Sequence, residues 1–201
     1  MNLMESRLYR FVEFFINLLL LNLLWLVCSF PVITIGPATA ALYSVTKDFI
    51  EKKETRVIKP YFTYFKELFK KSLFIGLVVP ILIIALIINF IYVLNYDNLL
   101  LLTFFLTFSL LVVAMATFIF PIMSIYKFTL IELIKNSLLF SILFLPVSLL
   151  NVSILISLAF ATLRFPIMIF INISLSSFLI YLLCKKAFSI AEDRRIIQIK
   201  A

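Results

Sequence analysis

The chain has 201 residues, of which 64% are hydrophobic and 14% charged, and its net charge is +8. Apolar residues make up about 45–50% of a typical soluble domain, so this composition excludes one and predicts apolar surface that faces lipid. The chain has no histidine, and its only thiols are those of Cys28 and Cys184. We therefore predict no metal site, no cofactor and no histidine-based catalysis.

Long runs without charged residues predict helices that cross the bilayer, because about 20 apolar residues span roughly 30 Å of hydrocarbon. In chain order the predicted membrane segments cover about residues 11–31, 37–50, 72–94, 99–126, 137–161 and 165–184. The second is short, so it spans with Lys47 reaching the interface, re-enters the membrane, or lies at its surface. The predicted fold class is all-α, a polytopic transmembrane helical bundle of about six membrane segments in a single domain.

Two prolines and a glycine interrupt the apolar run between the first two segments. Pro31 disfavours a helix at the residue before it, whereas Pro37 fits the first turn of a new helix that Thr34 or Gly36 could cap. The stretch is either a tight turn at the outer surface or the start of a buried half-helix whose positive end faces a cavity. The candidate functional motif comprises Pro31, Thr34, Gly36, Pro37 and Thr39.

Residues 47–71 are basic and include an amphipathic helix predicted over about 60–71. We expect this helix to lie in the headgroup interface on anionic lipid, with docking to a partner protein as the alternative. The residues expected at the membrane surface are Lys59, Lys66, Lys70 and Lys71. A second interfacial helix is predicted over about 127–136, where Thr129 and Glu132 have the spacing of a capping box.

The distribution of lysine and arginine predicts the topology. Residues 47–71, the lysines of the second interfacial helix and the tail at 185–201 are predicted to be cytoplasmic, and the turns near Asp97 and Arg164 external. Both termini are then cytoplasmic, with six crossings; the alternative has five crossings and an external N-terminus. Because the charges lie in short segments between apolar runs, they act as membrane anchors rather than as nucleic-acid ligands.

Amides are the main polar groups inside the predicted spans, where no ionisable residue lies near a centre. The candidate intramembrane polar contacts are Asn17, Asn22, Asn89, Asn151 and Asn172. An aqueous path lined by them would favour a transporter, whereas amides buried in pairs would favour a non-transporting bundle. Proton-coupled transport is disfavoured without a buried acid, and no catalytic motif is present, so we predict no enzyme and no catalytic residue.

Small residues predict where helices approach closely. Ser153, Ser157 and Ala161 recur every fourth residue in the fifth predicted span, which favours close packing there. Only two glycines occur in the chain, and they do not form a Gly-x-x-x-Gly motif.

Residues 22–25 and 30–43 resemble the YesL-like family of bacterial integral membrane proteins, a family of unknown function. The resemblance continues loosely through residues 61–71 and 132–136. Because genes for such proteins often lie beside sugar-uptake transporters and polysaccharide-degrading enzymes, the resemblance implies an accessory or regulatory role near carbohydrate uptake. It implies the bacterial cytoplasmic membrane and, as a partner, an ABC-type sugar permease or a membrane sensor. The alternative is a small facilitator or channel that acts alone or as an oligomer.

Overall fold

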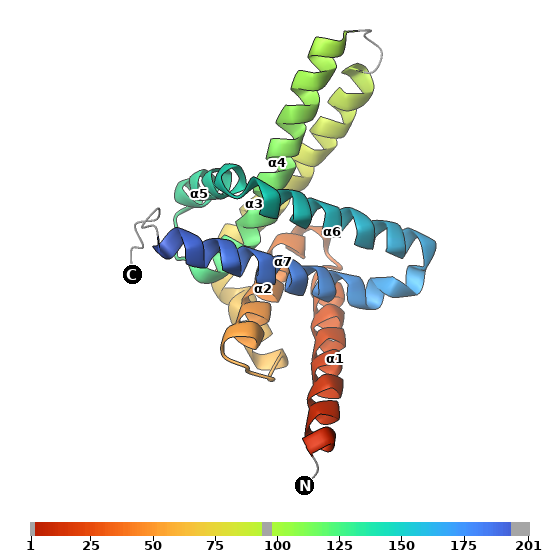
Figure 1. The fold of residues 1–201 in the computed structure, drawn as a ribbon, viewed down its shortest axis with the longest axis vertical. Coiled ribbons are helices and arrows are strands. Elements are labelled where there is room, and N and C mark those ends of the chain that lie inside the picture. Colours follow the sequence, from red (N-terminus) through yellow and green to blue (C-terminus); the bar gives the residue numbers. More distant parts are fainter. Residues whose placement is uncertain (1–2, 94–97, 194–201) are drawn as a thin grey trace.

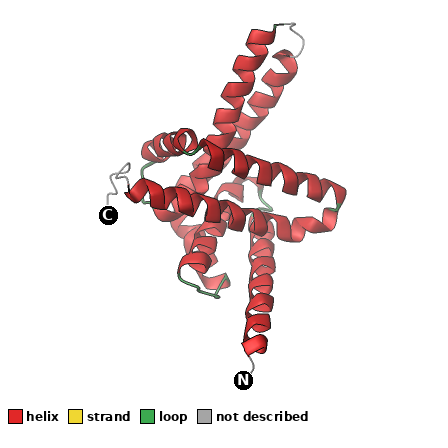
Figure 2. Cartoon of the chain, in the orientation of Figure 1, coloured by secondary structure: helices red, strands yellow, loops and turns green. Residues whose placement is uncertain are grey.

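The computed structural model describes residues 3–93 and 98–193, and every regular element in these ranges is helical (Figures 1 and 2). Two 3-10 helices, η1 Val32–Thr34 and η2 Pro166–Met168, precede α2 and α7. The α-helices are α1 Leu3–Cys28, α2 Ile35–Glu51, α3 Ile58–Val93, α4 Leu99–Ile125, α5 Leu130–Leu143, α6 Leu145–Arg164 and α7 Ile169–Asp193. The predicted all-α class is confirmed.

Five of these helices, α1, α3, α4, α6 and α7 with η2, are long and apolar enough to cross a membrane. Their outer faces carry large apolar side chains that no other helix covers, such as Phe104 at 75% exposed and Phe160 at 71%. A helix satisfies its own backbone hydrogen bonds, so such a surface is stable in hydrocarbon but not in water. The protein is a multi-pass membrane protein.

The remaining long helix, α2, is enclosed by its neighbours. It has 17 residues and packs against α1, α3, α4 and α7 (Figure 1). The small side chains of Ala38, Ala40 and Ala41 are at most 1% exposed, so adjacent helices approach its backbone closely. The short segment expected at residues 37–50 is therefore a helix covered by protein along most of its length.

Around α2, four of the other helices form two antiparallel hairpins that point in different directions. The α3–α4 hairpin projects from one side, and the α6–α7 hairpin crosses the molecule at a steep angle to it (Figure 1). The main core lies where α4, α5 and α7 meet. There the ring of Phe140 stacks on that of Phe118 at 6.0 Å and meets the edge of Phe188 at 5.1 Å.

Two predicted boundaries differ from the helices in the structure. The expected interfacial helix at 60–71 and the expected span at 72–94 form a single helix, α3, because nothing between Lys70 and Gly76 breaks a helix. Conversely, the span expected at 137–161 is divided at Phe144, whose ψ of 47° ends α5. Pro146 lies in the first turn of α6, and because it has no backbone N–H it cannot continue the hydrogen-bond ladder of α5.

Side-chain caps fix the start of two helices. Asn98 accepts from the backbone N–H groups of Leu100 and Leu101 at the start of α4. The rest of the turn expected at 95–98, like the end of the tail at 194–201, lies outside the described residues. The predicted capping box is confirmed: Thr129 Oγ1 accepts from the N–H of Glu132, whose carboxylate accepts from the N–H of Thr129.

Thr129→Ala is expected to destabilise the protein by about 1 kcal/mol, because one N–H at the start of α5 loses its acceptor. Thr129→Ser is the matched control, since a serine hydroxyl makes the same bond. The free energy of unfolding in detergent micelles measures both. An alanine variant as stable as the serine variant would contradict the capping role.

Candidate functional site

The predicted motif is divided between an exposed turn and a buried helix. Pro31, Val32 and Ile33 are exposed in the turn. The Thr34 hydroxyl closes this turn by donating to the carbonyls of Cys28 at 2.6 Å and Pro31 at 2.7 Å, so it does not cap α2. The turn is thus exposed, and the helix after it is buried.

Gly36 and Pro37, in the first turn of α2, are buried against α3. Gly36 faces Gly76 of α3, so the two glycines of the chain meet at this crossing. A Cβ atom on Gly36 would collide with the carbonyl oxygen of Ser72 and lie 2.7 Å from the Cα of Gly76. The backbones of α2 and α3 therefore touch at Gly36, where added bulk would meet backbone atoms of α3.

The apolar face of the amphipathic segment lies against α2 rather than against lipid. Tyr61 is fully buried and donates to the carbonyl of Ala38 at 3.2 Å. In the first half of α2, Thr39 donates to the carbonyl of Ile35 in the same helix. It also accepts from the indole N–H of Trp25 at 3.1 Å, which joins α2 to α1. The face expected in the headgroup interface is therefore a protein contact that fixes α3 on α2.

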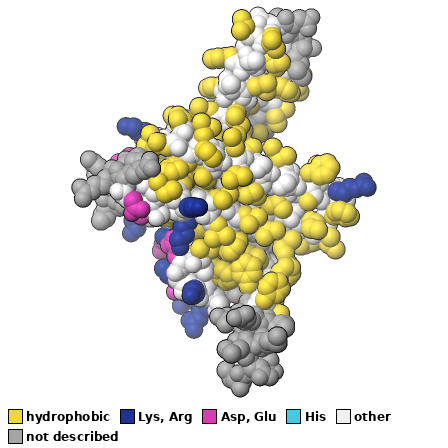
Figure 3. All heavy atoms as spheres, in the orientation of Figure 1, with side chains coloured by type: hydrophobic (Ala, Val, Ile, Leu, Met, Phe, Trp, Pro, Cys, Tyr) yellow, Lys and Arg dark blue, Asp and Glu magenta, His cyan; other side chains and the backbone are white. Residues whose placement is uncertain are grey.

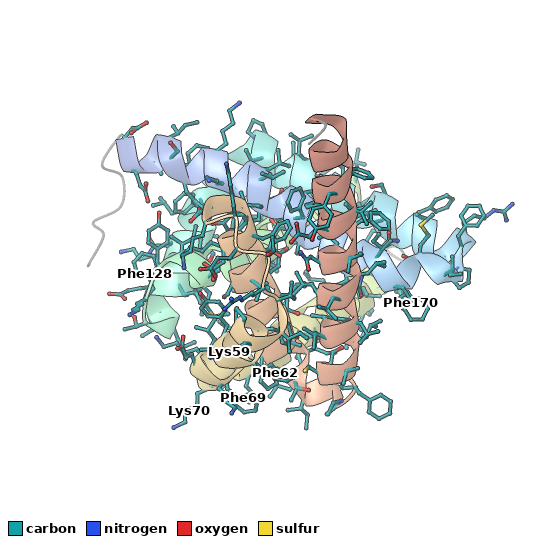
Figure 4. All side chains as sticks on the ribbon, turned by 90° about the horizontal axis from the view of Figure 1, so that it is seen from below. Lys59, Phe62, Phe69, Lys70, Phe128 and Phe170 are labelled. Carbon is teal, nitrogen blue, oxygen red and sulfur yellow. The ribbon has the colours of Figure 1, made fainter. Side chains whose placement is uncertain are left out.

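The expected surface lysines divide into two groups. Lys59, Lys66 and Lys70 are exposed on α3, and Figure 4 shows Lys59 and Lys70 in the lower part of the view, below Phe128 and Phe170. Lys71 is exposed but turns toward α5, where its ammonium donates to the carbonyl of Phe128 at 3.1 Å. The helical period explains the difference, because consecutive residues point about 100° apart.

The predicted intramembrane amides do not meet one another. Asn172 bonds Leu158 and Thr162 of α6, and the Asn89 side chain donates to a carbonyl of its own helix. Asn151 is fully buried and its amide N–H approaches Cys184 Sγ at 3.5 Å. The contacts of Asn151 and Asn172 join α6 to α7, that of Asn89 stays within α3, and none of them pairs two amides.

The nitrogens of the two amides of α1 lack hydrogen-bond partners among the described residues. Asn22 is 0% exposed, and neither its nitrogen nor its oxygen has a hydrogen-bond partner there. The nitrogen of Asn17 is likewise without one, and the hollow beside it measures only about 10 Å³. The hollow beside Asn17 is therefore too small to hold a solute.

Small-residue packing occurs at a different place from the one predicted. Ser153 and Ser157 are exposed, and each donates to a carbonyl of α6 itself. Close approach instead occurs at Gly36 and Gly76, and between α2 and α7, where Thr46 and Ser177 lie within 3.2 Å.

Charged groups gather where α2 ends (Figure 3). Asp48 is 4% exposed, yet its carboxylate accepts from the phenol of Tyr64 at 2.5 Å and pairs with Lys52 at 2.9 Å. The hydrogen bond and charge of Asp48 raise the pKa of Lys52. This contact between α2 and α3 was not predicted from the sequence.

Two further tyrosine–carboxylate pairs reinforce the same end of the molecule. Tyr181 of α7 is fully buried and donates to Glu51 at 2.8 Å, which ties α7 to the end of α2. Tyr126, just after α4, donates to Glu192 at 2.8 Å. Burial, together with this hydrogen bond, raises the pKa of the Tyr126 phenol, so the group stays a neutral donor at physiological pH.

Two hollows adjoin this charged end. An open one of about 800 Å³ lies beside residues 52–56, between α2 and α3. A smaller one of about 210 Å³ lies between α2, α3, the end of α4 and the start of α5.

In the ranges described, no group of three histidine, cysteine, aspartate or glutamate side chains converges to hold a metal ion. Cys28 and Cys184 are free thiols in the two separate core clusters.

Comparison with known proteins supports the resemblance seen in the sequence. The family described as "Protein of unknown function, DUF624" matches residues 18–90, which include all of α2 and its crossing with α3. The uncharacterized protein YteU of Bacillus subtilis (strain 168) is 29% identical over 180 residues, which cover 86% of this chain and 81% of that protein. No solved structure shows a significant match. Residues 18–90 thus carry the DUF624 match, which confirms the resemblance to the YesL-like membrane proteins, a family of unknown function.

Proposed function

We propose that this chain is a non-enzymatic accessory or regulatory component of carbohydrate uptake in the bacterial cytoplasmic membrane. Its partner would be an ABC-type sugar permease or a membrane sensor. The family resemblance motivates the link to sugar uptake. The observation that favours an accessory over a transporting role is the isolation of the intramembrane amides: each is buried separately, bonded within one helix pair or, for Asn89, bonded within its own helix.

A facilitator of its own would need a continuous polar path, because a sugar gives up its hydrogen bonds to water on entering the membrane. Within the described ranges the hollow beside Asn17 is about 10 Å³, and the two larger hollows both lie at the charged end. At the crossing of Gly36 and Gly76 itself, the backbones of α2 and α3 are too close to leave a passage between them. These features argue against a pore through one copy of the chain.

The charged end offers a surface for a partner. The open hollow beside residues 52–56 is lined by exposed side chains of both signs, including Lys53, Glu54 and Arg56. A mixed, exposed, charged surface suits a transient polar interface rather than a permanent apolar one. Under the predicted topology this surface faces the cytoplasm, where the cytoplasmic parts of a permease or sensor lie.

Affinity purification of the full chain from gently solubilised native membranes tests the proposal. We expect a sugar-permease subunit or a membrane sensor to co-purify, and Arg56→Glu to lower its recovery severalfold. Lys135→Glu on α5 is the matched control, because it changes the same charge at an exposed residue that does not line the hollow. Sugar flux through proteoliposomes that contain only this chain, with no partner recovered, would overturn the accessory role.

A further inference from the structure

The smaller hollow, of about 210 Å³, has an unusual concentration of positive charge for its size. Lys47 of α2, Lys71 of α3 and Lys127 after α4 line it, against a single glutamate, Glu67. The phenol of Tyr64 also lines it. An excess of two positive charges in a concave, partly desolvated site is a feature that attracts anions.

Two of these lysines are held in place by the backbone. Lys47 Nζ donates to the carbonyl of Ser124 in the last turn of α4, and Lys71 Nζ donates to the carbonyl of Phe128, each at 3.1 Å. The Ser124 carbonyl lies at the C-terminal end of α4, where free carbonyls carry partial negative charge and favour a cation, whereas the Phe128 carbonyl lies in the loop between α4 and α5. Each ammonium has three donors, so two remain on each lysine for a ligand. The two ammonium groups are therefore held in position and still have N–H donors for a ligand.

The position of this hollow favours the phosphate of a lipid. It lies where the apolar helix α4 ends at Ile125, and if α4 spans the bilayer this end lies near the headgroups. Beside it, α5 exposes Ile131 at 80% and Ile134 at 42%. A phosphate on the lysines and acyl chains along these apolar residues would match an anionic phospholipid. The volume is below the range of about 300–1,000 Å³ that encloses drug-sized ligands, and suits a headgroup fragment.

We propose that the hollow between α2, α3, α4 and α5 binds the phosphate group of an anionic phospholipid through Lys47 and Lys71, with Lys127 at its rim. This site is distinct from the outward stripe of Lys59, Lys66 and Lys70, which faces away from it. It is also independent of the accessory role, because a lipid site of this kind serves any function that the membrane protein has.

Native mass spectrometry of the full chain, released from micelles with equal phosphatidylglycerol and phosphatidylcholine, tests this site. We expect wild type to retain phosphatidylglycerol, and Lys47→Gln/Lys71→Gln to lower that retention by about tenfold or more, since two charge-assisted hydrogen bonds are lost. Lys66→Gln/Lys70→Gln removes the same charge from the outward stripe, and we expect a change below about twofold. Lys71→Gln alone, at an exposed residue, gives a milder variant that keeps the Lys47 contact with α4.

The outcomes separate the sources of phosphate. Equal losses in the two double variants, or no loss in either, would overturn the site. Inorganic phosphate is added to wild type in a separate arm, with thermal unfolding as the readout. If it stabilises the protein without lipid, and the Lys71→Gln variant abolishes that effect, the lysines bind phosphate but the lipid assignment is wrong. If it neither stabilises wild type nor displaces phosphatidylglycerol, the lipid assignment is supported.

Discussion

Gly36→Val is expected to destabilise the protein by about 3 kcal/mol or more, the upper part of the range for overpacking a close contact. The added Cβ meets backbone atoms, the carbonyl oxygen of Ser72 and the Cα of Gly76, which cannot move aside as the tip of a side chain can. The helices α2 and α3 must separate instead, and the bond between Tyr61 and Ala38 is weakened. Unfolding in mixed detergent micelles measures the effect.

Gly36→Ala separates this explanation from the filling of a cavity. Because the Cβ itself makes the collision, we expect alanine to cost about 1–3 kcal/mol as well. Ala85→Val adds bulk to an exposed part of α3 and should change stability by less than about 0.5 kcal/mol. A Gly36→Val variant as stable as wild type, but inactive, would mean that Gly36 borders a functional cavity and not a helix crossing.

Asp48→Ala is expected to destabilise the protein by about 3 kcal/mol, because it removes a buried charge with specific partners. The change leaves the Tyr64 phenol without its acceptor and removes the ion pair to Lys52. It thereby loosens the end of α2 from α3. The same unfolding assay in micelles gives the loss.

A double-mutant cycle with Tyr64→Phe assigns the effect to the bond between the two helices. We expect a coupling energy of about 1–2 kcal/mol between Asp48 and Tyr64, which are in direct contact. Lys52→Met should cost less than about 1 kcal/mol, since more than half of the Lys52 side chain is exposed and its ion pair is screened by water. Additive effects of Asp48→Ala and Tyr64→Phe would contradict a structural role for the bond.

Local signals in the sequence determined much of the fold. Composition and uninterrupted apolar runs predicted an all-helical membrane protein, because the length and apolarity of a span are properties of the segment alone. Thr129 and Glu132 predicted the start of α5 for the same reason, since a capping box joins residues three apart. The pattern of basic and polar residues did not show that the segments predicted at 60–71 and 72–94 form one continuous helix, α3. It also did not show that a break falls at Phe144.

Only the tertiary structure decided which of these residues meet. Gly36 and Gly76 are 40 residues apart, and Asp48 and Tyr64 are 16 apart. Nothing in the sequence near either glycine shows that the lack of a side chain there lets the backbone of the other helix approach. Lys70 and Lys71 look alike in sequence, but one helical step turns the first outward and the second toward α5. A contact between two helices depends on the rotation and depth of both, which packing of the whole bundle fixes and neither segment specifies alone.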